Sequence, residues 1–217
     1  MTQPQTPVQT ETASEWVADR LKERTWPAHQ AAEKHGFQRA MLTGAAGIGA
    51  YIEQMRQMRL VHEELESALR AAGTPRVTSV YRGYHDRAGL IGQDLGVLGA
   101  AAACEPLPST REMIGVIRSA RHDQPDSLLG VLYVLEGSTN GGRFIARAME
   151  KSYGLEPRRG TAWLDPHGEE QRPRWKQFRR DISAPVWDEV EIEQLGRAAD
   201  ATFGYAAALM DDLAAAQ

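Results

Sequence analysis

The six residues Gly137-Ser138-Thr139-Asn140-Gly141-Gly142 interrupt what otherwise reads as one long apolar helix. Apolar side chains at helical spacing lie on both sides, over residues 128–135 and 144–149. Each glycine inside a helix costs about 1 kcal/mol relative to alanine. Two explanations stay open from this stretch alone. The glycines let a flat ligand approach the backbone, or Gly137 ends one helix and Ser138 or Thr139 caps the next.

The same helical periodicity continues along most of the chain. It predicts further helices over about residues 48–72, 86–103, 109–117, 175–182 and 187–213, with a loop over about 154–173. No alternating strand of useful length and no internal repeat is present in the sequence. We therefore predict an all-α, single-domain bundle of seven to nine helices over residues 14–217, preceded by a disordered tail over residues 1–13.

Composition and charge exclude several classes of protein. The chain has 217 residues and a single cysteine, which excludes an internal disulfide framework. A formal net charge of −4 argues against a general nucleic-acid-binding protein. Neither a transmembrane run nor a secretory signal is recognisable, so we expect a cytoplasmic protein that binds no membrane.

A histidine in the first amphipathic segment is a candidate metal ligand. The segment begins at Ser14, and His29 and Glu33 lie four residues apart, on one helix face. A carboxylate in that position can hydrogen-bond one imidazole nitrogen and leave the other for a metal. An ordinary solvated surface pair is the alternative. Pro27 predicts a kink just before the histidine.

Two stretches together resemble the heme oxygenase family, in particular the biliverdin-forming enzymes of bacteria. LKERTWPAHQAAE (residues 21–33) is similar to the family's proximal helix, in which a histidine ligates the heme iron. LYVLEGSTNGGRFIAR (residues 132–147) is similar to the distal helix, which is kinked at glycines and lies over the heme. The resemblance continues through residues 160–163 and 175–180 and covers most of the chain from about residue 14 to 213.

The resemblance implies a fold, a reaction and partners. It implies a heme oxygenase-like helical bundle in which heme b is both cofactor and substrate. Oxygen and external electrons would open the ring, giving biliverdin, carbon monoxide and ferrous iron. The expected donor is a ferredoxin or a reductase, with ascorbate as a substitute in vitro. A bilin-binding photoreceptor is an expected partner from similar bacterial proteins.

The resemblance also assigns residues. It makes His29 the iron ligand and places Gly137, Ser138 and Gly141 on the catalytic distal face. The heme-binding residues that it implies are Lys22, His29, Tyr133, Gly142, Lys176 and Arg180. For Tyr133, a place in the core is an equal alternative. Cations such as Lys176 and Arg180 suit the heme propionates because they pair with carboxylates.

One departure from the family's pattern leaves alternatives open. Many relatives carry an aspartate just after the first distal glycine, where it holds a water network that supplies protons, and here that residue is Ser138. Asn140 and Glu136 are candidates to replace it. A non-catalytic protein that stores, senses or delivers heme is therefore a second hypothesis. A third is a thiaminase-like hydrolase, which needs a nucleophilic cysteine, and only Cys104 is available.

Overall fold

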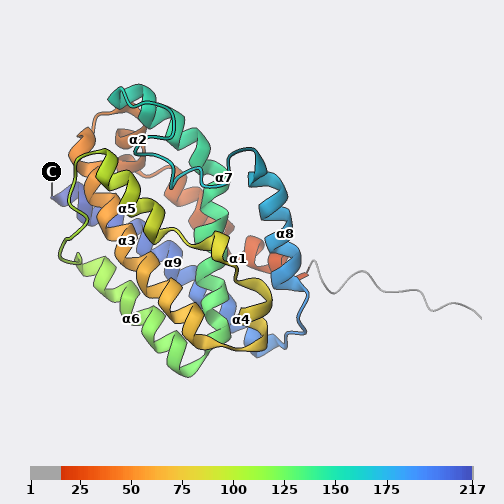
Figure 1. Cartoon of the computed structure of the whole chain (residues 1–217). Coiled ribbons are helices and arrows are strands. Elements are labelled where there is room, and N and C mark those ends of the chain that lie inside the picture. Colours follow the sequence, from red (N-terminus) through yellow and green to blue (C-terminus); the bar gives the residue numbers. More distant parts are fainter. Residues whose placement is uncertain (1–15, 217) are drawn as a thin grey trace, which may run out of the picture.

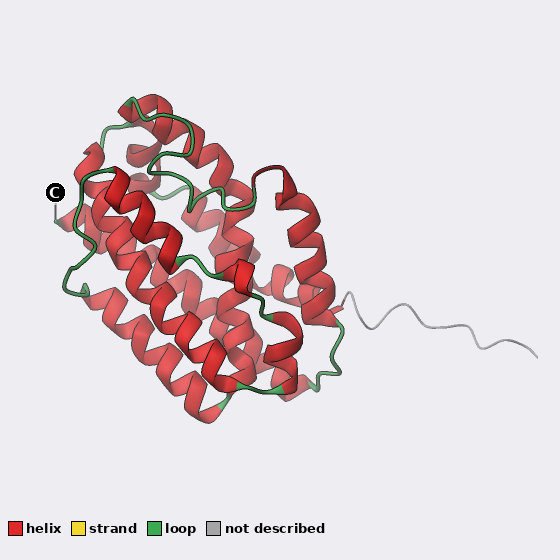
Figure 2. Ribbon diagram, in the orientation of Figure 1, coloured by secondary structure: helices red, strands yellow, loops and turns green. Residues whose placement is uncertain are grey.

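The apolar stripes of the sequence bury one another in a bundle of helices (Figure 1). The computed structural model describes residues 16–216, so the expected tail over residues 1–13 lies outside the described residues. Within that range the chain forms nine α-helices, three short 3₁₀ helices and no strand (Figure 2), which confirms the predicted all-α class. The elements are α1 (Trp16–Glu33), α2 (Gly36–Thr43), α3 (Gly47–Ala72), α4 (Pro75–Val80), η1 (Gly83–His85), α5 (Ala88–Val97), α6 (Pro108–Asp123), η2 (Pro125–Ser127), α7 (Leu128–Tyr153), η3 (Gly168–Glu170), α8 (Gln171–Ser183) and α9 (Glu189–Ala215).

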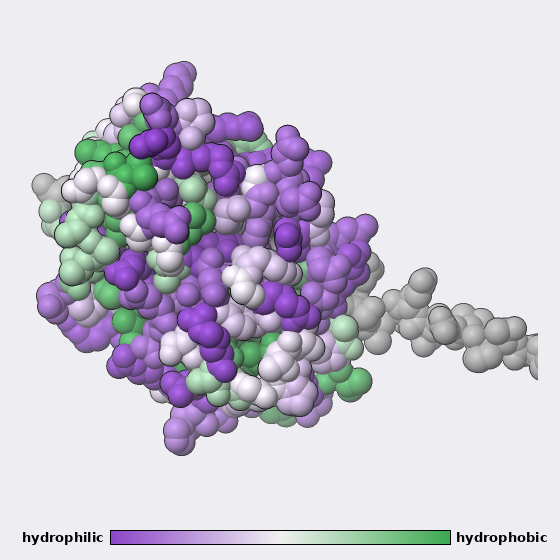
Figure 3. All heavy atoms as spheres, viewed as in Figure 1, coloured by the Kyte–Doolittle hydropathy of each residue, from purple (hydrophilic) through white to green (hydrophobic). Residues whose placement is uncertain are grey.

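The glycine-containing helix α7 runs lengthwise through the molecule. Its first two turns are buried on all sides, as an apolar run of this kind requires. α7 packs against α9, and α9 also packs against α1 and α6. α3 packs against α5 and α6. Figure 1 shows α3, α5 and α6 on one side of α7 and α8 on the other. The surface seen from this side is mostly hydrophilic, with scattered hydrophobic residues (Figure 3). Across residues 16–216, no helix combines the length and hydrophobicity needed to cross a bilayer.

α7 does not break at its glycines. It is one continuous α-helix from Leu128 to Tyr153, which excludes the alternative of two capped helices. The hydroxyls of Ser138 and Thr139 donate to the carbonyl oxygens three residues earlier, at 2.7 and 2.6 Å, and the Asn140 amide does the same at 2.9 Å. These side chains therefore bond to the backbone of their own helix instead of capping a new one. α7 ends at Gly154, which is in a left-handed conformation.

Several boundaries differ from the prediction. The helix expected over residues 109–117 extends from Pro108 to Asp123, and the one expected over residues 175–182 begins at Gln171. The helix expected over residues 86–103 ends at Val97, because Gly99 turns the chain with φ +67°. A six-residue helix, α4, follows the predicted stop at Gly73, and it begins with the Thr74 cap and Pro75. The N-terminal segment ends as a helix at Glu33, and the next helix starts from a separate cap at residue 35.

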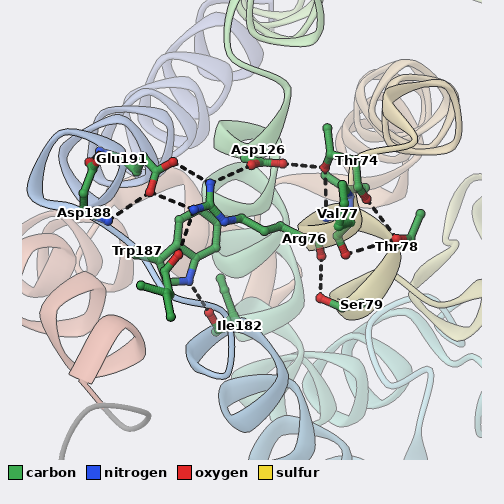
Figure 4. A network of polar contacts seen from close by, with 12 residues as sticks. Thr74, Arg76, Val77, Thr78, Ser79, Asp126, Ile182, Trp187, Asp188 and Glu191 are labelled. Atoms are coloured by element: carbon green, nitrogen blue, oxygen red, sulfur yellow. Dashed lines mark hydrogen bonds and ion pairs between the residues drawn. The ribbon is translucent and has the colours of Figure 1, made fainter.

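A network of charged side chains ties the end of α8 and the start of α9 to α4 and η2 (Figure 4). The Arg76 guanidinium donates to Glu191 at 2.9 Å and to Asp126 at 3.0 Å, and it lies 4.5 Å from the centre of the Trp187 ring. The Trp187 indole donates in turn to the Ile182 carbonyl at 2.9 Å. One arginine therefore joins three segments that are distant in sequence.

A glycine fixes the crossing of the two central helices. A Cβ added at Gly130 would lie 2.1 Å from the Leu195 carbonyl oxygen, in the backbone of α9. Because backbone cannot move aside cheaply, we expect Gly130→Ala to lower the free energy of unfolding by about 1–3 kcal/mol. Gly115→Ala is the matched control, since nothing lies within 4 Å of that position in α6. Urea unfolding should show the control equal to or more stable than wild type, and equal stability of both variants would contradict this packing.

Candidate functional site

His29 lies on α1 between two aromatic side chains. Its imidazole stacks on Trp26 with 5.5 Å between ring centres, and the edge of Phe203 from α9 approaches it at 6.0 Å. The side chain is 43% exposed, so it is reachable from outside. α1 stays helical through Pro27.

One nitrogen of His29 is poised beside a carboxylate. Nδ1 lies 3.6 Å from Oε1 of Glu33, beyond a good hydrogen bond, and it is buried without a hydrogen-bond partner among the described residues. A small rotation of the Glu33 side chain closes that bond. Nδ1 then carries the proton, and the lone pair of Nε2 remains available to a metal.

The three glycines of α7 have different surroundings. Nothing lies within 4 Å of a Cβ added at Gly141, which is exposed, as are Ser138 and Phe144. A Cβ at Gly137 would lie 3.2 Å from the indole of Trp175. At Gly142 it would lie 1.9 Å from the backbone carbonyl oxygen of residue 164. The lack of a side chain at Gly142 therefore lets a protein loop cross closely over α7. This corrects the predicted place of Gly142 against a ligand.

Neither candidate replacement for the family's aspartate points to the exposed face of α7. Glu136 is 2% exposed and is bound to other buried side chains. Asn140 bonds the Gly137 carbonyl at 2.9 Å and lies 3.4 Å from the amide of Gln171. Ser138 is the polar side chain exposed beside Gly141, and its oxygen still has lone pairs that can accept from water.

Contacts at two points connect α7 with the N-terminal helices. The Tyr133 hydroxyl donates to the Ala18 carbonyl of α1 at 3.3 Å, and the Ser152 hydroxyl donates to the Leu42 carbonyl of α2 at 3.0 Å. His29 lies between Ala18 and Leu42 in the sequence, and Gly141 lies between Tyr133 and Ser152. Both residues therefore fall between the two points at which the helices are joined.

Burial raises the pKa of Tyr133 to about 12. In this structure the tyrosine is a core residue whose hydroxyl binds α1, as the second of its two predicted roles requires.

The predicted cations are exposed. Lys22 on α1 and Lys176 and Arg180 on α8 all present charged groups to solvent. Within residues 16–216 neither lysine forms an ion pair, and Arg180 donates to the Gln177 side chain at 2.6 Å. Arg179 is different, since it pairs with Asp19 and so joins α8 to α1.

A buried ionic cluster behind α7 was not predicted. Arg87 donates to Glu136 at 2.8 Å, and the other oxygen of Glu136 lies 2.7 Å from Nε2 of His167. Burial favours the neutral acid, but the His167 hydrogen bond and the Arg87 charge outweigh it and lower the pKa of Glu136. The cluster joins the start of α5, the middle of α7 and the loop before η3. Because its members are far apart in sequence, no motif indicates it.

Two buried histidines beside this cluster predict a loss of stability in mild acid. Burial, aided by the charge of Arg87, lowers the pKa of His62 from 6.5 to about 3 and that of His85 to about 4. Below pH 6.5 the unfolded chain binds protons that the folded chain does not, so stability falls as the pH drops. We expect about 2 kcal/mol of loss per histidine between pH 7 and 5.

Urea unfolding at the two pH values measures this. His62→Gln and His85→Gln should each flatten the decline, whereas His122→Gln should not, because that side chain is 90% exposed. Equal slopes in all four proteins would show that the buried histidines do not cause the decline.

Two other features lie apart from these residues. Cys104 is partly buried, and burial, followed by the charge of Glu53, raises the pKa of its thiol, which disfavours the thiolate that a hydrolase would need. A cavity of about 260 Å³ opens beside the Arg76 network. Its lining includes Asp123, Asp126 and Glu191, and their negative charges would repel an anionic ligand.

The sequence and the fold both match known proteins. Residues 15–212 match the family described as heme oxygenase. Among curated proteins none matches this sequence. Heme oxygenase-1 of the cyanobacterium Synechocystis, solved in complex with heme, superposes with a TM-score of 0.85 at 18% identity, covering 92% of this chain and 93% of that one. Heme oxygenase-2 of the same organism, with heme and NO, also gives 0.85, at 20% identity over 91% and 84%. A Shewanella denitrificans domain of unknown function with a heme oxygenase-like fold gives 0.67, at 14% identity over 97% and 94%.

Proposed function

This chain belongs to the heme oxygenase family, and on that premise we propose that it binds heme b and cleaves it to biliverdin, carbon monoxide and ferrous iron. The observation that carries the proposal is His29, whose buried Nδ1 faces Glu33 and has no hydrogen-bond partner in the described chain. A histidine that directs Nδ1–H to a carboxylate presents Nε2 as a basic metal ligand. The open backbone at Gly141 is the second feature that fits a flat ligand.

Each helix has a separate task in this proposal. α1 supplies Nε2 of His29, and Glu33 sets its tautomer and orientation. α7 supplies the side-chain-free surface at Gly141, which limits what fits between the ligand and the helix. Bound heme supplies the iron that activates oxygen and the ring carbon that is oxidised. The Ser138 hydroxyl donates to the Leu135 carbonyl at 2.7 Å, and its oxygen lone pairs stay available to accept a hydrogen bond from water because the residue is exposed.

The two acidic groups of heme call for cations. Lys176 and Arg180 lie four residues apart on α8 and therefore share one face, and both are exposed. Lys22 lies seven residues before His29, two turns away on α1, where it can reach the same ligand. An arginine can bind a carboxylate through two parallel hydrogen bonds, which fixes orientation as well as position.

Ser138 favours a second candidate function. A hydroxyl positions water but has no charge with which to hold a proton relay, so a protein that binds heme without cleaving it is the alternative. Ser138→Asp tests whether the missing charge limits turnover. If proton supply limits turnover, the aspartate variant should cleave heme faster than wild type.

The experiment combines binding and turnover. Hemin should give the purified protein a sharp Soret band, and ascorbate or a ferredoxin system in air should convert it to the broad red absorption of biliverdin, with release of carbon monoxide. A Soret band that persists with reductant and oxygen would favour the binding-only function. No Soret band would reject both.

We further propose that the electrons come from a separate ferredoxin or reductase and that a bilin-binding photoreceptor receives the product. Pull-down of either partner with the hemin-loaded protein tests these assignments. We also propose a cytoplasmic location, to be tested by fractionation of the source cells.

A further inference from the structure

The bare face of α7 is covered at one glycine and open at the next. Cη2, Cζ3 and Cζ2 of the Trp175 indole lie 3.2, 3.7 and 3.8 Å from the position of a Cβ at Gly137. One turn later, nothing lies within 4 Å of a Cβ added at Gly141. A flat ligand that rests on this helix therefore meets backbone at Gly141 and an indole at Gly137.

The indole is held firmly. It stacks nearly parallel to Phe178, with 5.7 Å between ring centres and 17° between planes, and it lies 5.4 Å from the Tyr133 ring. Phe178 is fully buried, and Tyr133 is bonded to the backbone of α1. Each aromatic pair contributes about 0.5–1.5 kcal/mol beyond burial, so turning the indole away is unfavourable. Trp175 is a fixed wall.

The wall and the cations belong to one rigid element. Lys176 follows Trp175 directly on α8, and Arg180 lies one turn further on. The pair between Arg179 and Asp19 joins the same helix to α1. The backbone positions from which the two cations extend are therefore fixed relative to the indole that blocks Gly137.

We infer that Trp175 is a specificity-determining residue, which selects the edge of the macrocycle that lies at Gly141. The inference rests on the proposed function. With its carboxylates drawn to Lys176 and Arg180, the ring cannot extend over Gly137, because the indole occupies that space. It would extend toward the open backbone at Gly141, and the ring carbon placed there would be the one that is oxidised.

The test replaces the indole and follows the seating of the ligand without turnover. In the ferric, cyanide-bound hemin complex, the heme methyl proton resonances report how the ring is rotated in its site. We expect one dominant set in wild type and in Trp175→Phe, and a second set in Trp175→Ala. The ratio of minor to major biliverdin isomer should rise about tenfold in the alanine variant, which equals about 1.4 kcal/mol of lost discrimination.

Trp187→Ala is the matched control. That indole is also partly buried, with a hydrogen bond to the Ile182 carbonyl at 2.9 Å and a cation over its ring, but it lies in the Arg76 network. The control should lose stability and keep the wild-type resonances and isomer ratio. If Trp175→Ala does not fold, Trp175→Leu takes its place.

The outcomes separate the two proposals. Unchanged resonances and an unchanged isomer ratio in a folded Trp175 variant that binds hemin would overturn the proposed role of Trp175. That result would leave the proposed function intact. If wild type binds hemin without opening it, the resonances still show whether Trp175 determines how the ring is rotated in the site. If wild type gives no hemin complex, both proposals fail.

Discussion

Replacing His29 by alanine is expected to remove the axial ligand of the bound iron and to abolish ring opening. The variant should keep its fold, since the side chain is 43% exposed and forms no hydrogen bond among the described residues. Hemin should bind more weakly, with a shifted and broadened Soret band. Turnover should fall at least about a hundredfold, because loss of a positioned catalytic group costs on that scale or more.

Added imidazole gives this prediction a direct control. Imidazole should enter the space left in His29→Ala and restore both the Soret band and part of the turnover. His35→Ala should retain wild-type spectra, since that ring caps α2 by accepting a hydrogen bond from the Phe37 backbone at 3.2 Å. A His29→Ala protein with wild-type spectrum and activity would remove this residue from the site.

Arg87→Met is expected to have the largest effect on stability. Arg87 and Glu136 are 4% and 2% exposed, and their side chains lie 2.8 Å apart. Removing the cation leaves a carboxylate buried beside His167 alone, which costs about 3–5 kcal/mol in comparable buried pairs. Urea unfolding at pH 7 should show this loss as a lower midpoint. Arg87→Met combined with Glu136→Gln should recover part of it, because no buried charge is then left uncompensated.

An exposed ion pair provides the comparison. Arg118 donates to Glu64 at 2.8 Å on the surface, where its own side chain is 67% exposed. Arg118→Met should leave the unfolding midpoint nearly unchanged, since solvent screens such pairs. Similar losses in Arg87→Met and Arg118→Met would mean that the buried cluster contributes no more than the surface pair.

The sequence was a good guide to long elements and a poor one to short ones. Twenty-six residues of α3 carry a sustained apolar stripe with a glycine after it, so its end at Ala72 was predictable. The six residues of α4 are too few for periodicity to show. The alanine run after Gly99 has high helix propensity, but the left-handed turn at that glycine ended α5 earlier. Packing of the long apolar run of α7 against α9, which local propensity does not include, offsets the cost of its glycines.

Local spacing could indicate candidates for the site, but not what surrounds them. The four-residue separation of His29 and Glu33 predicted their proximity, which the 3.6 Å distance bears out. Gly137 is covered by Trp175, 38 positions later, and Gly142 by the backbone of residue 164, 22 positions later. Neither contact follows from a helical repeat. Glu136 lies away from the exposed face because it is two residues before Ser138 on the helix, and its partner Arg87 comes from 49 residues earlier. Helix geometry decides which face each residue of the motif lies on, and long-range partners decide what covers that face.

The most direct measurement is a crystal structure of the protein grown with hemin. It should show iron bonded to Nε2 of His29, the carboxylates toward Lys176 and Arg180, and the ring against the backbone at Gly141. Hemin bound elsewhere, with His29 pointing to solvent and Gly141 uncovered, would contradict the account.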